Sequence, residues 1–180
     1  SNCNSTTIAG NNFTTSAADA TTTTSAGTST SSGGAGAAAK ATDVVDSTSH
    51  GWSAVGAGEL ASMTIKSASI AVTGVSFVPK TAVSGVSIEV ASLKAKPAAL
   101  DTPAGKVYQY LDITPKNLND ASIDKAAITF TVTKKWLGDN GVSEDGAALL
   151  RYNDKKWNEL STKKTDSSDS SVTYEATTPG

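Results

Sequence analysis

The sequence contains one cysteine, one histidine and few charged side chains, and each shortage excludes a class of protein. Of its 180 residues, 18% are charged and 6% are aromatic, and the formal net charge is −2. One cysteine and one histidine are too few for a zinc, iron–sulfur or haem site built from several such ligands, so we expect no metal and no cofactor. The lack of a basic excess argues against nucleic acid as a partner. No apolar run approaches the roughly 20 residues of a membrane-spanning helix, so no transmembrane segment is expected.

The sequence also has few side chains that could form a catalytic site. A Ser-His-Asp site would need His50, the only histidine of the chain, and a nucleophile needs such a base beside it. The sequence therefore predicts no catalytic residues and a protein that is not an enzyme. A structural or binding protein outside the cytoplasm fits the composition better.

Residues 1–43 form an N-terminal arm of low complexity. Serine, threonine, alanine and glycine dominate it, and its larger apolar side chains are Cys3, Ile8 and Phe13. Such a segment buries little apolar surface to offset the entropy of ordering its backbone. Two interpretations stay open: a solvated tail, or a segment ordered by neighbouring subunits. Threonine-rich chain has the β propensity to be captured as a strand on a partner's sheet edge.

The arm also holds three candidate modification sites. Cys3 is an odd cysteine, which in a secreted protein suggests an intermolecular disulfide or a free thiol. Asn4 and Asn12 begin the tripeptides Asn-Ser-Thr and Asn-Phe-Thr, so each is a candidate for an N-linked glycan.

From residue 44 onward the sequence is typical of an all-β domain. Polar and apolar residues alternate in short runs that are rich in β-branched side chains and end at turn signals. In the clearest run, Ile128, Phe130 and Val132 are expected to point inward. The predicted strands are residues 62–66, 69–78 with a break or bulge at Gly74, 86–90, 106–113, 127–133, 148–152, 156–160 and 171–176.

These strands predict an Ig-like antiparallel β-sandwich over residues 44–180, preceded by the extended Ser/Thr/Ala/Gly-rich arm of residues 1–43. Residues 153–155, Asn-Asp-Lys, are expected to form a hairpin turn. One short helical turn is expected at residues 135–137. The open edges of such a sandwich are templates for pairing with another chain.

Three motifs in the C-terminal half resemble the PGF-pre-PGF domain of archaeal, especially methanogen, cell-surface proteins. They are the Tyr-Gln-Tyr of residues 108–110, the Arg-Tyr-x-x-x-x-Trp of residues 151–157 and the Thr-Pro-Gly of residues 178–180. With a looser likeness from about residue 60, the resemblance spans some two thirds of the chain and leaves out residues 1–43. It implies an extracellular β domain of an envelope protein, and it brings no catalytic residues with it.

The sequence departs from the family after Gly180. Similar domains continue past Thr-Pro-Gly into a short aromatic, apolar strand, and this sequence ends there. If that strand is missing from the sheet, its place is vacant. We expect that another subunit's N-terminal arm could fill it.

Other conspicuous side chains are expected to have structural roles. Glu144 and Asp145 match no EF-hand spacing and are interpreted as a solvated turn. Trp136 and Trp157 are expected in the core, and Trp52 is expected near the domain boundary, where it could pack on a neighbouring subunit. The lysine pairs are interpreted as edge protection or as partners for acidic groups of another subunit; they are residues 134–135, 155–156 and 163–164.

Two functions fit this pattern. The first is an extracellular structural protein of the archaeal cell envelope that assembles with itself into a sheath, filament or surface layer. The arm would join its subunits, and Cys3 could add a covalent link. The alternative is a binding or adhesion module displayed at the cell surface on a glycosylated, Ser/Thr-rich stalk.

Overall fold

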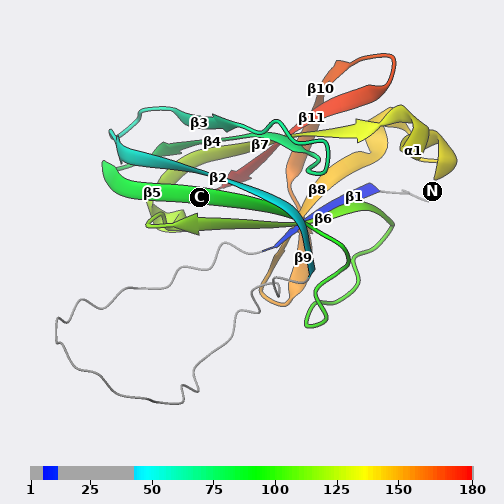
Figure 1. Cartoon of the computed structure of the whole chain (residues 1–180), viewed down its shortest axis with the longest axis horizontal. Coiled ribbons are helices and arrows are strands. Elements are labelled where there is room, and N and C mark those ends of the chain that lie inside the picture. Colours follow the sequence, from blue (N-terminus) through cyan, green and yellow to red (C-terminus); the bar gives the residue numbers. More distant parts are fainter. Residues whose placement is uncertain (1–5, 12–42, 180) are drawn as a thin grey trace.

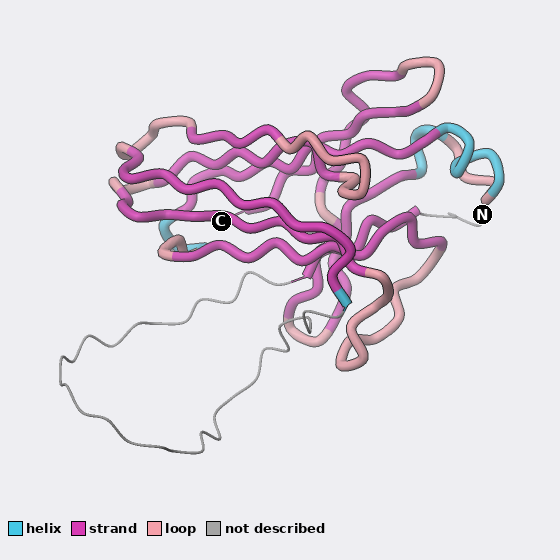
Figure 2. The backbone as a smooth tube through the Cα atoms, viewed as in Figure 1, coloured by secondary structure: helices cyan, strands magenta, loops and turns pink. Residues whose placement is uncertain are grey.

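A computed structural model of the chain describes residues 6–11 and 43–179, and strands account for most of them (Figures 1 and 2). A six-residue α-helix, α1 (Lys134–Asp139), and two 3-10 turns, η2 (Asp120–Ser122) and η3 (Glu144–Gly146), connect strands. The strands are β1 (Thr6–Asn11), β2 (Val44–Val55), β3 (Ala61–Thr64), β4 (Val72–Pro79), β5 (Val83–Leu93), β6 (Lys106–Lys116), β7 (Ile123–Thr133), β8 (Ala147–Asn153), β9 (Lys156–Glu159), β10 (Ser161–Ser167) and β11 (Ser171–Pro179).

The strands form two sheets. One has six strands in the order β2-β5-β6-β1-β8-β9, and the other has five in the order β10-β11-β7-β4-β3. Nearly all neighbours are antiparallel; β1 alone runs parallel to both of its neighbours. The predicted all-β sandwich fold is thereby confirmed.

The core lies between the sheets and follows the alternation in the sequence. On β7, Ile128, Phe130 and Val132 are buried as predicted, while the threonines between them face outward. Phe130 stacks on Tyr174 of β11 with ring centroids 5.2 Å apart. β-Branched and aromatic side chains suit such a pleated, half-buried surface, which explains why this stretch is so readily recognised as a strand.

Local turn chemistry agrees with the sequence in three places. Asp154 and Lys155 both have positive φ between β8 and β9, as a two-residue type I′ hairpin turn requires. The β4 register shifts between Val72 and Gly74, which makes Thr73 the extra residue, directly before the glycine where the irregularity was expected. The helical turn forms as α1, where the Thr133 side chain accepts a hydrogen bond from the backbone N–H of Trp136.

Three strands were not predicted. β2 begins at Val44, where the sandwich was expected to begin, but serine, histidine and glycine interrupt its alternation. β10 is almost wholly exposed and has no apolar face to reveal it. The third, β1, comes from inside the predicted arm. Within residues 6–11 and 43–179, no helix is long and apolar enough to cross a membrane.

Candidate assembly site

β1 occupies an interior position of the six-stranded sheet, between β6 and β8 (Figure 1). Its residues face residues 106–112 of β6 on one side, and Thr6 to Asn11 face Ala147 to Tyr152 of β8 on the other. Among the described residues, the strands that pair with β8 are β1 and β9. Without β1, the β8–β9 hairpin would therefore lose its hydrogen bonds to the rest of the sheet. We call the space between β6 and β8 the slot.

The walls of the slot are buried as interior strands are. The four residues Ala147–Leu150 of β8 are all buried, so β8 is covered on both of its faces there. On β6, Leu111 and Ile113 are 1% and 3% exposed. A strand with covered faces and two neighbours reads as a continuous apolar run rather than as an alternation. This run was the signal in the sequence that β8 does not lie at an edge.

The β6 wall is anchored at a bulge and at the residue that follows it. Thr7 faces Val107 and Ile8 faces Gln109, so Tyr108 is the extra residue. Its ring packs edge-to-face against Trp136 of α1 at a centroid distance of 5.2 Å. The Gln109 side chain bonds to the segment that precedes β4 of the other sheet. Its Oε1 accepts from the Ala71 N–H at 2.7 Å, and its Nε2 donates to the Ser69 carbonyl at 2.8 Å.

The β8 wall is held by bonds that do not involve β1. Arg151 donates from Nη2 to Oδ2 of Asp120 at 2.6 Å, and from Nη1 to the Thr178 hydroxyl at 3.3 Å. The Arg151 side chain is 14% exposed, so this ion pair is less screened by water than a surface pair. The Leu149 N–H donates to Oγ1 of Thr162 at 3.2 Å. The hairpin is thus tied to the rest of the sandwich independently of the strand that fills the slot.

The connection from β1 to β2 is much longer than the distance it has to span. Asn11 lies level with Asp112 of β6, and Val44 pairs with Leu93, which pairs with Tyr110 of β6. Asn11 and Val44 are therefore three strand spacings apart across the sheet and two residues apart along the strands. The distance between them is about 16 Å. The connecting residues 12–43 number 43 − 11 = 32, and 32 extended residues reach about 100 Å.

The three candidate modification sites, Cys3, Asn4 and Asn12, lie outside the described residues. Cys3 and Asn4 lie three and two positions before the start of β1 in the sequence, and Asn12 immediately follows its end. Any modification there would be placed at the ends of the strand that fills the slot.

The three tryptophans do not form a common platform. Trp52 packs edge-to-face on Phe77 at 5.3 Å, and Trp157 packs on Tyr152 at 5.0 Å, while Trp136 contacts Tyr108. Trp136 and Trp157 were expected in the core, but both are only partly buried. Trp136 lies on a short helix and packs against the core, whereas Trp157 lies on an edge strand. His50 lies against Trp52 at 4.6 Å.

The acidic turn at Glu144 is neutralised within the chain. The Glu144 carboxylate lies 3.1 Å from Nζ of Lys134 and 3.4 Å from Nζ of Lys164, and Asp145 lies 3.1 Å from Lys164. The hydrogen bond from Lys134, followed by that from Lys164, lowers the pKa of Glu144. The backbone carbonyl of Glu144 accepts from the Tyr174 hydroxyl at 2.6 Å. Burial, with added effects of Glu144 and Asp145, raises the pKa of Tyr174 to about 12.

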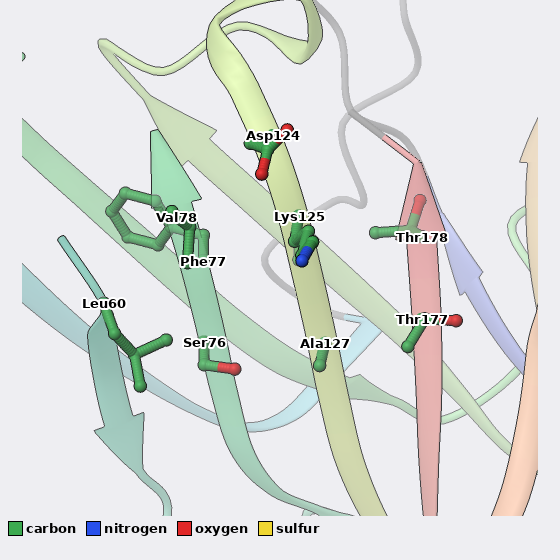
Figure 3. A pocket seen from close by; sticks show the side chains of 10 residues that line it. Leu60, Ser76, Phe77, Val78, Asp124, Lys125, Ala127, Thr177 and Thr178 are labelled. Atoms are coloured by element: carbon green, nitrogen blue, oxygen red, sulfur yellow. The ribbon is translucent and has the colours of Figure 1, made fainter. Parts of the chain in front are cut away.

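No metal centre is visible in residues 6–11 and 43–179, which contain no group of three His, Cys, Asp or Glu side chains arranged to hold an ion. An open groove of about 410 Å³ runs over the outer face of the five-stranded sheet, with side chains from β4, β7 and β11 and Leu60 around it (Figure 3). Its lining is mainly apolar, and Asp124 and Lys125 are its charged members. Leu60 is 65% exposed at one end of it.

No protein family, curated protein or solved structure matches the chain. The resemblance to the PGF-pre-PGF domain therefore stays a prediction, and the slot with its strand from the arm is the feature on which a function can be argued.

Proposed function

We propose that the protein is an extracellular structural protein of the archaeal cell envelope that polymerises by strand exchange, with β1 of one subunit filling the slot of the next. The observation that carries this proposal is the place of β1. An interior strand of the sheet is supplied by a low-complexity arm, through a 32-residue connection. Such a strand can be provided by the same chain or by a neighbour without any change in its contacts.

The chemistry of the slot suits a strand of low sequence complexity. Main-chain hydrogen bonds to both neighbours supply the attraction, and these bonds ask little of side chains. β1 has the sequence Thr-Thr-Ile-Ala-Gly-Asn. Because each subunit offers one strand and one slot, exchange is a head-to-tail contact, and such contacts build open filaments when they do not close into a ring.

Residues on either side of β1 would reinforce the joint. Cys3 would travel with the strand to the neighbouring subunit, where it could form an intermolecular disulfide, and glycans on Asn4 and Asn12 would flank the joint. An oxidising, extracellular setting is the one in which a disulfide persists. The archaeal envelope enters through the resemblance to the PGF-pre-PGF domain.

The groove on the five-stranded sheet favours the second candidate, a cell-surface binding or adhesion module on a glycosylated stalk. An apolar, open groove with Leu60 at its rim could accept a ligand. In that case, the arm of residues 1–43 would act as the spacer that displays the sandwich, and it would join no subunits.

Electron microscopy of the purified protein separates the two candidates. We expect the full chain to form filaments, tubes or lattices. A variant that lacks residues 1–42 should form none, and adding a peptide of residues 1–16 should fill its slot without restoring assembly. Isolated particles of the full chain at every concentration would contradict polymerisation and favour the displayed binding module.

A further inference from the structure

The sandwich has four edge strands, and three of them carry features that discourage pairing. β3 and β9 are four residues long, and β9 begins with Lys156 and ends with Glu159. β10 is longer, but it carries Lys163 and Lys164 and is bulged just after them. Short length, lysines and bulges are the ordinary means by which sheet edges avoid other chains.

The fourth edge, β2, has little of this protection. It is 12 residues long and contains no lysine, arginine or proline. Its only carboxylate, Asp46, already accepts a hydrogen bond from the Ser67 hydroxyl at 2.6 Å. The bulge lies at the very start of the strand, before Asp46, so that residues 46–55 keep a regular register with β5. From Ser47 to Ala54, most residues are exposed.

The exposed edge is also held firmly in place. Trp52 packs edge-to-face on Phe77 of the opposite sheet, and Val55 is 3% exposed in the core. β2 pairs with β5 along its whole length. A second strand would therefore bind to an edge that is already ordered, so the entropic cost of ordering β2 on binding would be small.

We propose that β2 pairs antiparallel with β2 of a second copy, which joins the two six-stranded sheets into one. Identical strands related by a two-fold axis form a self-complementary contact. Apart from His50 and Trp52, the side chains from Ser47 to Ala54 are small or hydroxylic, and Asp46 is the only carboxylate of β2, so a second β2 meets little repulsion. When the axis passes through Thr48, Asp46 of each copy lies opposite His50 of the other, and the imidazole is a partner for the carboxylate.

This contact would turn a filament into a sheet or sheath. Strand exchange alone links subunits into one filament, whereas a two-fold contact at β2 joins each filament to a second one. That consequence rests on the proposed function, because it needs filaments built by strand exchange. The β2 contact itself does not, because it leaves the slot untouched.

A monomer with a locked slot tests the contact in isolation. Thr7 and Ala148 are Cα partners across the slot. T7C and A148C in one chain with C3S, refolded in dilute solution and oxidised, should fix β1 in its own slot and prevent exchange. We expect this full-length variant to be a monomer–dimer mixture by sedimentation equilibrium at about 100 µM.

Lysines placed on β2 should break that dimer. The variant S47K/S49K puts four like charges beside the two-fold axis, and we expect its dimerisation to weaken about tenfold or more. The matched control, S161K/T165K, adds the same charge to the exposed strand β10 and should dimerise like the parent. Circular dichroism and urea midpoints should confirm that all three variants are folded.

A locked parent that stays monomeric, or an S47K/S49K variant that dimerises as strongly as its control, would overturn the proposal. Failure of strand exchange gives a different result. In that case the unlocked full chain would form dimers and nothing longer, and these dimers would still be sensitive to S47K/S49K.

Discussion

Shortening the connection between β1 and β2 should separate assembly from folding. Deleting residues 16–40 removes 25 of the 32 connecting residues and leaves 32 − 25 = 7, with Asn12 and its tripeptide retained. Seven extended residues reach about 23 Å, which is enough for the roughly 16 Å between Asn11 and Val44 within one chain. β1 can therefore still fill its own slot.

The same deletion should prevent β1 from reaching a neighbour. A domain of about 140 residues has a radius of gyration of about 14 Å, so equivalent points in two touching copies lie about 37 Å apart. Because the two ends of the connection lie about 16 Å apart within one copy, it must span between about 21 and about 53 Å to reach a neighbour's slot. The natural connection spans that whole range, whereas the shortened one, at about 23 Å, reaches only its lower limit. Closing a shorter loop also costs less entropy, by about 1.3 kcal/mol for this change in length. The isolated subunit should thus become slightly more stable, with its melting temperature raised by about 3–5 °C.

Negative-stain electron microscopy and thermal unfolding of the same preparations check both expectations. The matched control replaces residues 16–40 by a Gly/Ser sequence of equal length, which keeps the reach and should assemble like the natural chain. Filaments of normal length from the shortened variant would refute the reasoning, because they would show that assembly does not need the reach of the connection.

Three further predictions concern the sandwich and the arm. Phe130→Ala should lower the free energy of unfolding by about 3–5 kcal/mol in urea titrations, because Phe130 is fully buried and stacks on Tyr174; a loss below about 1 kcal/mol would contradict the core described above. The pKa of Tyr174 is raised to about 12 from about 10 in the unfolded chain, so its contribution to stability is complete below about pH 10 and is lost as the pH rises towards 12. Tyr174→Phe should accordingly show a smaller drop in urea midpoint between about pH 9 and 11.5 than the parent, and an equal drop would exclude this origin. Cys3→Ser should leave assemblies intact but make them indifferent to dithiothreitol, whereas natural assemblies that ignore the reductant would show that Cys3 does not cross-link them.

The two-sheet core could be predicted because alternation and burial have the same cause. On β7 and β11, one face packs against the opposite sheet and the other meets solvent. Apolar and polar residues therefore alternate along the sequence, and this alternation identifies the strands directly. The turn at Asp154 and Lys155 could be predicted because a short polar segment separates two runs typical of strands, although lysine is unusual at the positive φ that Lys155 adopts.

The slot could not be predicted in the same way. β1 has one large apolar residue, Ile8, in six, and its pairing depends on backbone groups that every residue carries. Its parallel partners lie about 100 and 140 positions away in the sequence, so nothing local marks it. The apolar run Ala147–Leu150 of β8 is typical of an interior strand, but it does not say which strand lies beside it. The suggestion that the arm could fill a vacant place came from the composition of the arm and from the family resemblance.

β2 and the tryptophans could not be predicted correctly from the sequence for a different reason. The alternation of β2 is broken at His50 and Gly51, because much of this edge strand faces solvent on both sides and has few positions that must be apolar. Trp136 and Trp157 have the size of core residues, yet both are only partly buried, although Trp136 packs against the core. Size alone does not distinguish a core position from a partly covered one.

The most direct test of strand exchange is a cross-link between two different chains. One chain carries T7C and the other carries A148C, both in the C3S background, so that the disulfide between the two different chains reports β1 of the first in the slot of the second. After the two are co-assembled and mildly oxidised, we expect a cross-linked dimer on non-reducing gels that is lost on reduction. A disulfide that forms only when both cysteines are in one chain, and never between chains in the assembled material, would contradict strand exchange.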